Sequence, residues 1–197
     1  MREEGKVRAE GIGEVERAAN FVKYLAGEVF RIEGSRLASV RPGIEGETTR
    51  APLGVIAAIT PWNYPVSMIT RKVAPALAAG CTVVLKPAEA TPLTAMATMR
   101  VFEDAGVPKG VVNLVTCSDP GPVGEVFVNH PKVRKLTFTG STAVGKMLAG
   151  KAAANMKRVS CELGGHAPFL VFEDADPVHA AKGAQLVKFL NTGQACI

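Results

Sequence analysis

Short apolar runs alternate with amphipathic stretches along most of the chain. The runs are rich in β-branched residues, which predicts strands, and the stretches repeat apolar residues at spacings of three and four, which predicts helices. Strands are expected at residues 54–60, 81–86, 110–116, 135–139, 158–163 and 168–172. Helices are expected at residues 14–31, 66–79, 93–105, 123–129, 143–154 and 177–190. This alternation favours an α/β fold, a doubly wound parallel sheet with helices on both faces.

The segment before the first core strand has a different pattern. In residues 35–52, two short extended stretches flank a Pro42-Gly43 turn, and apolar and polar residues mix without a strong core face. This pattern predicts a β-hairpin that projects as an arm.

Composition and charge narrow the class of protein. With 47% apolar residues, the 197-residue chain is long enough to bury a core, which excludes disorder as the main state. The net charge of +5 is spread without a basic block, so we expect no nucleic-acid partner. The charged start and the lack of a long apolar run predict a cytoplasmic protein with no membrane partner. The four cysteines are not closely paired, so no metal site is expected.

Polar loops follow several apolar runs, at the strand ends where open α/β sheets bind ligands. The run Gly140 to Gly145 opens a helix whose free N–H groups and dipole suit a phosphate, although an ordinary capped helix fits the same residues. Lys86 and Glu89 follow another strand. Glu89 there would accept hydrogen bonds from ribose hydroxyls and repel a 2′-phosphate, whereas two solvated surface charges are the alternative.

Three further residues are candidates for chemistry. Cys196 lies beyond a glycine-containing turn, where a thiol can ionise and act as a nucleophile, although cysteines are usually buried and inert. Glu162 ends a strand before two glycines, so it is either a general base or an exposed strand-end carboxylate. Asn63 lies between two prolines, either as an amide donor or as part of a structural turn.

Taken together, these motifs resemble those of the aldehyde dehydrogenase superfamily. The resemblance runs from about residue 11 to the last residue and rests on ITPWNYP, VVLKPAEATP, FTGSTAVG, CELGG and NTGQAC. The stretches PWNYPVSMITRKVAPALAAGCTVVLKPAEATP and ELGGHAPFLVF are most similar to the succinate-semialdehyde dehydrogenase branch. The arm VRPGIEGETTRAPLG is also similar to that of ketoglutarate-semialdehyde enzymes.

The resemblance implies oxidation of an aldehyde, succinate semialdehyde or a related semialdehyde, to the carboxylic acid with NAD(P)+. Cys196 matches the nucleophile, which forms a thiohemiacetal and then a thioester. Glu162 matches the base that activates water, and Asn63 matches the side-chain donor that stabilises the oxyanion. Arg71 matches an arginine that holds the distal carboxylate of the substrate.

The resemblance also implies a cofactor site, which decides the phosphate alternative in favour of binding. Lys86 and Glu89 match the clamp on the adenosine ribose, and Glu89 favours NAD, with NADP as the other possibility. The remaining cofactor-binding residues that it implies are Thr60, Pro61, Trp62, Thr139, Gly140, Ser141, Gly145 and Leu163.

Members of this superfamily start before Met1 and continue past Ile197, so the resemblance implies an internal fragment that is inactive alone. The full-length form is expected to be a homodimer or homotetramer. Two alternatives are a non-catalytic nucleotide-binding module of the same fold and a gene fragment without function. The implied parts are residues 1–34 (helical part of the NAD-binding domain), 35–52 (oligomerisation hairpin), 53–163 (Rossmann-like NAD(P)-binding domain) and 164–197 (start of a truncated catalytic domain).

Overall fold

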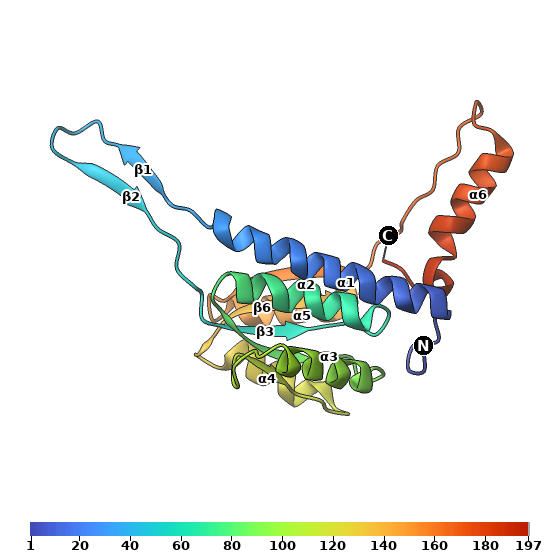
Figure 1. The fold of residues 1–197 in the computed structure, drawn as a ribbon, viewed down its shortest axis with the longest axis horizontal. Helices are drawn as coiled ribbons and strands as arrows, with labels where there is room; N and C mark the ends of the chain where they lie inside the picture. The colour runs from blue at the N-terminus through green and yellow to red at the C-terminus, as the bar shows by residue number, and fades with distance from the viewer. Residues whose placement is uncertain (197) are drawn as a thin grey trace.

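The computed structural model describes residues 1–196, in which helices surround a central five-stranded sheet (Figure 1). The helices are α1 (Arg8–Glu28), α2 (Pro65–Ala78), α3 (Pro92–Asp104), α4 (Pro120–Asn129), α5 (Thr142–Ala153) and α6 (Pro177–Lys188). The strands are β1 (Ser35–Ala38), β2 (Glu45–Thr48), β3 (Val55–Ile59), β4 (Thr82–Lys86), β5 (Val112–Leu114), β6 (Val133–Gly140) and β7 (Arg158–Leu163). Two short 3-10 helices, Val29–Arg31 and Leu190–Gly193, follow α1 and α6.

The five strands of the central sheet are parallel and lie in the order β5-β4-β3-β6-β7. From β3 the chain winds outward to β4 and β5, then returns to the other side of β3 and continues through β6 to β7. The winding direction therefore reverses between β3 and β6. Open α/β sheets bind ligands beyond the carboxyl ends of strands at such a switch point. The doubly wound, Rossmann-like fold is confirmed.

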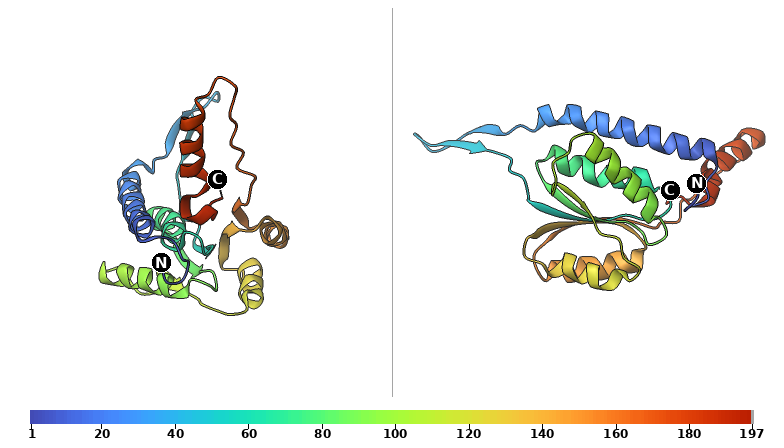
Figure 2. Two further views of the ribbon diagram at one scale, coloured as in Figure 1. Left: turned by 90° about the vertical axis from the view of Figure 1, so that its right-hand side faces the viewer. Right: turned by 60° about the horizontal axis from the view of Figure 1, so that its bottom comes forward.

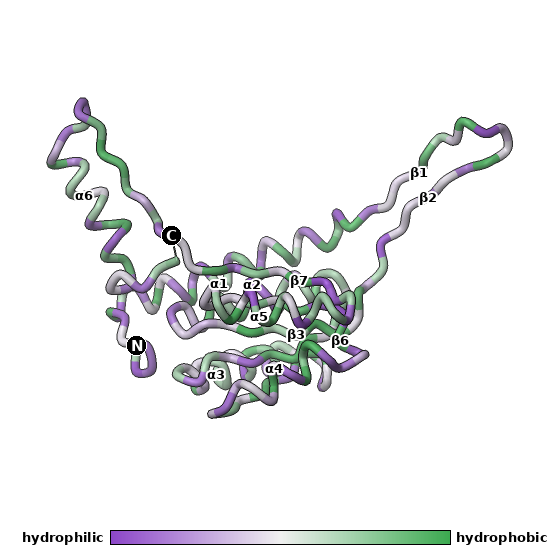
Figure 3. The backbone as a smooth tube through the Cα atoms, turned by 180° about the vertical axis from the view of Figure 1, so that it is seen from behind, coloured by the Kyte–Doolittle hydropathy of each residue, from purple (hydrophilic) through white to green (hydrophobic). Residues whose placement is uncertain are grey.

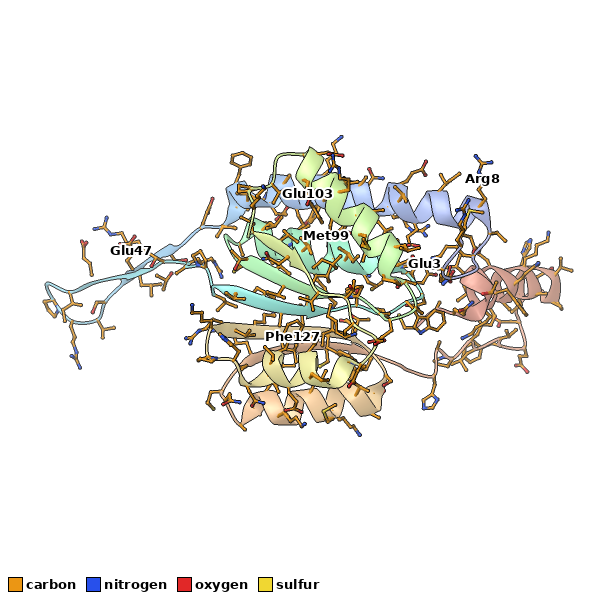
Figure 4. The ribbon with its side chains drawn as sticks, turned by 90° about the horizontal axis from the view of Figure 1, so that it is seen from below. Glu3, Arg8, Glu47, Met99, Glu103 and Phe127 are labelled. Atoms are coloured by element: carbon orange, nitrogen blue, oxygen red, sulfur yellow. The ribbon has the colours of Figure 1, made fainter. Side chains whose placement is uncertain are left out.

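Helices cover both faces of this sheet (Figure 2). Successive residues of β3 point to opposite faces, so Ile56 and Ala58 pack with α2 and α3, whereas Ala57 packs with α4 and α5. Leu136 of β6 and Phe127 of α4 are buried in the same apolar cluster as Ala57, on the face covered by α4 and α5 (Figure 4). Because both faces are packed, the ends of β3 and β6 form a rigid base for a site.

The hairpin of β1 and β2 projects away from the sheet, and α1 lies along α2 (Figure 1). The two hairpin strands are antiparallel, with Ser35 opposite Thr48. Gly43 in the turn has a φ of +77°, a left-handed conformation that glycine adopts without steric cost. The predicted arm is confirmed. Its role in oligomerisation and the four domain boundaries stay predictions.

Two expectations about secondary structure are wrong. The apolar run at 168–172 forms no strand, because it leads away from the sheet toward α6 and a strand needs a hydrogen-bonding neighbour. Figure 3 shows this stretch as hydrophobic, and Phe172 is 72% exposed. Helix α1 begins at Arg8 rather than at residue 14. Glu10 and Glu14 on its first turns accept hydrogen bonds from the backbone N–H groups of Asn191 and Val66, and these tertiary contacts hold the first turns in helical conformation.

The sequence predicts a cytoplasmic protein with no membrane partner. No helix within residues 1–196 is long and apolar enough to cross a membrane. The cytoplasmic location stays a prediction.

Candidate active site

Two cavities include residues at the carboxyl ends of the strands, and the second of them also extends along the sheet to the amino ends. The first, here called the α5 cavity, has a volume of about 360 Å³ and lies between the ends of β3, β4 and β6 and the helices α4 and α5. Cavities of this size hold small ligands. Eight of the ten predicted cofactor-binding residues line it: Thr60, Pro61, Trp62, Lys86, Glu89, Thr139, Gly140 and Ser141.

The first turn of α5 opens into this cavity. Ser141 is its N-cap, and the Ser141 Oγ accepts a hydrogen bond from the backbone N–H of Val144 at 3.4 Å. A side chain on Gly140 would place a Cβ 2.6 Å from the ring of Phe138, so glycine is required where β6 meets α5. The free N–H groups and the positive end of the helix dipole therefore face the cavity, an arrangement that suits an anionic group such as a phosphate.

Gly145 and Leu163 do not line the α5 cavity, although both were assigned to the cofactor from the sequence. Gly145 is buried in α5, and a Cβ at this position would collide with Leu163 of β7. These two residues therefore set how closely α5 packs on the sheet. Their contact with a cofactor stays a prediction.

The Lys86–Glu89 pair lies at another wall of this cavity. The Lys86 Nζ is buried, pairs with Glu89 and donates to the Pro87 carbonyl at 3.1 Å. Burial works against ionisation of Glu89, but the hydrogen bond and charge of Lys86 hold the pKa of Glu89 below its ordinary value. Thr60 Oγ1 is buried without a hydrogen-bond partner among residues 1–196. A carboxylate and an unsatisfied hydroxyl beside the α5 N-terminus are groups that can hydrogen-bond a phosphate-bearing ligand, and the contact of Glu89 with a ribose stays a prediction.

The second cavity, here called the thiol cavity, has a volume of about 600 Å³. It brings together three residues assigned to chemistry or substrate, Cys196, Glu162 and Arg71, from three separate segments of the chain. Cys196 and Glu162 are both exposed, whereas Cys81 is buried in the core. Thr139, at the end of β6, is part of the wall of both cavities.

Asn63 lies beside the turn that carries Cys196 rather than on the wall of either cavity. Its Nδ2 donates to the Gln194 carbonyl at 2.9 Å, and its Oδ1 is buried without a partner among the described residues. The amide has a second N–H available. Asn63 therefore contacts the turn that carries Cys196, and its role as an oxyanion donor stays a prediction.

Lys72 is a residue of the thiol cavity that the sequence motifs did not single out. Its side chain is 7% exposed, and its Nζ donates to Thr137 Oγ1 at 3.0 Å. Burial lowers the pKa of Lys72 to about 8, although the charge of Glu162 opposes that shift. The sequence does contain a signal by which Lys72 could have been found: it lies on the same helical face as Met68 and Ala76, where an apolar residue is expected.

The thiol cavity and α5 cavity hold no evident metal site. Among residues 1–196, no group of three His, Cys, Asp or Glu side chains is placed to hold a metal ion. The arrangement offers a thiol, a carboxylate, an amine and a guanidinium around one space, next to a separate anion-binding helix terminus.

The chain is similar in sequence to several known dehydrogenases. The chain is 51% identical over 195 residues to 3-sulfolactaldehyde dehydrogenase of Pseudomonas putida, covering 99% of this chain and 40% of that protein. It is 49% identical to succinate-semialdehyde dehydrogenase [NADP(+)] 1 of Schizosaccharomyces pombe, covering 99% of this chain and 39% of that protein.

Solved structures of other proteins have a similar fold. The crystal structure of succinate-semialdehyde dehydrogenase from Burkholderia pseudomallei matches with a TM-score of 0.96 and 49% identity, over 99% of this chain and 40% of that one. The model of the aldehyde dehydrogenase family matches residues 1–197. The chain therefore belongs to the aldehyde dehydrogenase family, and it spans about 40% of the length of the curated relatives that it matches.

Proposed function

We propose that this chain carries the NAD-binding and nucleophilic parts of a semialdehyde dehydrogenase. One observation carries the proposal: Cys196 and Glu162 line a cavity that shares the wall residue Thr139 with the α5 cavity. A thiol and a carboxylate beside the α5 cavity suit oxidation of an aldehyde through a covalent intermediate. When bound, NAD supplies the hydride acceptor.

The residues of the thiol cavity take separate roles in this proposal. The Cys196 thiolate adds to the aldehyde carbon and forms a thiohemiacetal, while Asn63 and the backbone N–H of Cys196 stabilise the oxygen anion. After oxidation to the thioester, Glu162 takes a proton from water, which then attacks the acyl carbon. The acid is released and the thiol is restored.

The proposed substrate is a short aldehyde with a distal acidic group. Arg71 places a guanidinium on the wall of the thiol cavity, and guanidinium groups bind carboxylates and sulfonates with paired hydrogen bonds. The two relatives named above are called dehydrogenases of 3-sulfolactaldehyde and of succinate semialdehyde, which are both acidic aldehydes.

The preferred cofactor in this proposal is NAD. The ionised Glu89 carboxylate suits ribose hydroxyls and repels a 2′-phosphate. The Schizosaccharomyces pombe relative is named for NADP, so this preference is a property to be measured in this chain.

Calorimetric titration with each dinucleotide tests the cofactor proposal. Wild-type protein should bind NAD at least about tenfold more tightly than NADP, a difference of about 1.4 kcal/mol. Glu89→Gln removes the repelling charge and should reduce this ratio at least about fivefold. Glu103→Gln is the matched control, because Glu103 also pairs with a cation three residues away, Arg100 at 3.6 Å, but lies on α3 (Figure 4). Equal affinity for the two dinucleotides in the wild type contradicts the proposal.

A non-catalytic nucleotide-binding module is the second candidate. It is favoured by the α5 cavity, which is complete within residues 59–148, whereas Cys196 is exposed at the edge of the thiol cavity. Alkylation of Cys196 by iodoacetamide, followed by peptide mass spectrometry, separates the two. Binding of NAD with a Cys196 no more reactive than the same cysteine in urea supports the module.

Self-association through the hairpin is also proposed, as a homodimer or homotetramer of the longer protein. Both hairpin strands are exposed along most of their length, and Leu37 and Ile44 present apolar side chains. Sedimentation of the chain with and without residues 35–48 tests this. An unchanged mass after the deletion, in a chain that was oligomeric before it, contradicts the proposal.

A further inference from the structure

A buried ion pair lies outside both cavities, between the N-terminal segment and α1. Lys6 and Glu14 are each 3% exposed, and the Lys6 Nζ lies 2.5 Å from the Glu14 Oε2. The same ammonium donates to the Asn63 carbonyl at 2.9 Å, lies 4.3 Å from the centre of the Tyr64 ring, and is 3.7 Å from a Glu4 carboxylate oxygen. Each of these contacts is stronger in a dry interior than in water.

The other carboxylate oxygen of Glu14, Oε1, caps the N-terminus of α2. It accepts hydrogen bonds from the backbone N–H groups of Val66 at 2.8 Å and Ser67 at 3.0 Å. The N-cap residue of this helix, Tyr64, provides no side-chain cap. Glu14 therefore does from α1 what a cap residue normally does locally, and it fixes the helix that begins immediately after the Asn63 loop.

From Asn63 the contacts continue to the turn before the thiol. The Asn63 carbonyl also accepts from Asn191 Nδ2 at 2.9 Å, and Asn63 Nδ2 donates to the Gln194 carbonyl at 2.9 Å. The backbone N–H of Asn191 donates to Glu10 Oε1 at 3.1 Å. Asn191 and Thr192 have φ values of 53° and 57°, a left-handed pair that non-glycine residues adopt only when surrounding contacts hold them.

We infer that Lys6 and Glu14 are positioning residues that hold Asn63 against the Cys196 turn. The inference rests on the proposed roles of Cys196 and Asn63. Lys6 fixes the carbonyl of Asn63 and Glu14 fixes the helix after it, so the Asn63 amide keeps one geometry relative to the thiol. Displacements of about 1 Å at such a donor cost on the order of a hundredfold in rate. The ion pair therefore acts on the chemistry through Asn63, without contact with a substrate.

Two reagents at Cys196 separate this role from simple structural support. With 4-nitrophenyl acetate, the thiolate adds to the ester carbon, and the tetrahedral oxyanion expels 4-nitrophenolate to leave an acetyl thioester; the thiol proton goes to buffer. With iodoacetamide, the thiolate displaces iodide and no oxyanion forms. The ratio of acylation rate to alkylation rate, measured on the Cys196 peptide, therefore reports the oxyanion donor rather than access to the thiol.

The test variant is Lys6→Met with Glu14→Gln, which removes both charges together and keeps an acceptor for the α2 N–H groups. The matched control is Glu3→Gln, because Glu3 caps α3 from the same N-terminal segment, accepting from Leu93 and Thr94 at 2.7 Å (Figure 4). The double variant should lower the acylation-to-alkylation ratio about tenfold or more, and Glu3→Gln should leave it within about twofold. Glu14→Asp alone keeps both charges but draws the carboxylate back from the α2 N–H groups by one methylene. It is the second variant if the double variant melts below the assay temperature, and should lower the ratio at least about threefold.

The outcomes distinguish this inference from the proposed function. An enhanced ratio in the wild type that persists in the folded double variant overturns the inference alone. An equal fall in Glu3→Gln also overturns it, because any lost cap would then have the same effect. If wild-type Cys196 is acylated no faster than the unfolded chain in urea, the proposed function fails and the inference fails with it.

Discussion

Lys6 and Lys72 are both buried lysines beside the candidate active site, but only Lys6 has a full set of partners. Lys6 has a carboxylate at 2.5 Å, a carbonyl and an aromatic ring, whereas Lys72 has one hydrogen bond to the Thr137 hydroxyl and no ion pair within the described residues. A compensated charge holds neighbouring groups in place. An uncompensated one loses its proton more easily, as the pKa of Lys72 near 8 indicates.

Removal of Lys6 is the largest expected effect. Lys6→Met leaves the Glu14 carboxylate buried without its cation and should lower the free energy of unfolding by about 3 kcal/mol. Urea denaturation followed by circular dichroism measures this. The double variant with Glu14→Gln should recover part of the loss, because the buried Glu4 carboxylate still lacks its cation. A single variant within about 0.5 kcal/mol of the wild type would contradict the contrast between the two lysines.

Removal of Lys72 should have the opposite sign. Lys72→Met replaces a poorly compensated amine by an apolar side chain of similar length and should raise the free energy of unfolding at pH 7 by about 2 kcal/mol. The same urea titration applies. A loss of stability would show that the hydrogen bond to Thr137 outweighs the cost of burial.

The pH dependence of stability sharpens the same contrast. Because the pKa of Lys72 falls to about 8 on folding, the unfolded chain binds more protons above pH 8, and stability rises with pH there. Between pH 7 and pH 9 this group should add about 1 kcal/mol to the wild type, relative to Lys72→Met. Parallel curves for the two proteins would contradict the assignment.

Lys86 is a third buried lysine, and its partner gives the smallest effect. Glu89 has a side chain that is 42% exposed, so solvent weakens its pairing with Lys86. Glu89→Gln should therefore lower the free energy of unfolding by less than about 1 kcal/mol, while it changes the NAD to NADP ratio. A loss of unfolding free energy as large as that of Lys6→Met would show that the Lys86–Glu89 pair mainly stabilises the fold.

Most of the sheet and helix pattern could be predicted because it depends on local periodicity. The run at 158–163 coincides with β7, and α2 to α6 differ from the expected ranges by only a few residues. The run at 168–172 has the same apolar character, but whether it pairs depends on a neighbouring strand that local sequence does not specify.

The motifs also indicated which residues would gather at the site, since parallel strands end on one edge. Cys196, Glu162 and Arg71 do line one cavity. The contacts of Lys6 could not be predicted, because Lys6 and Asn63 are 57 positions apart and meet only when α1 packs on α2. Local patterns carry no information about such a pairing.

The most direct test of the account measures whether the two cavities form one site. The rate of Cys196 alkylation by iodoacetamide is followed as NAD is added to the chain, with peptide mass spectrometry to assign the thiol. If they do, the rate at Cys196 changes saturably, with a midpoint equal to the calorimetric dissociation constant for NAD, and the rate at Cys117, which lines neither cavity, does not change. Calorimetric binding of NAD that leaves the Cys196 rate unchanged would contradict it.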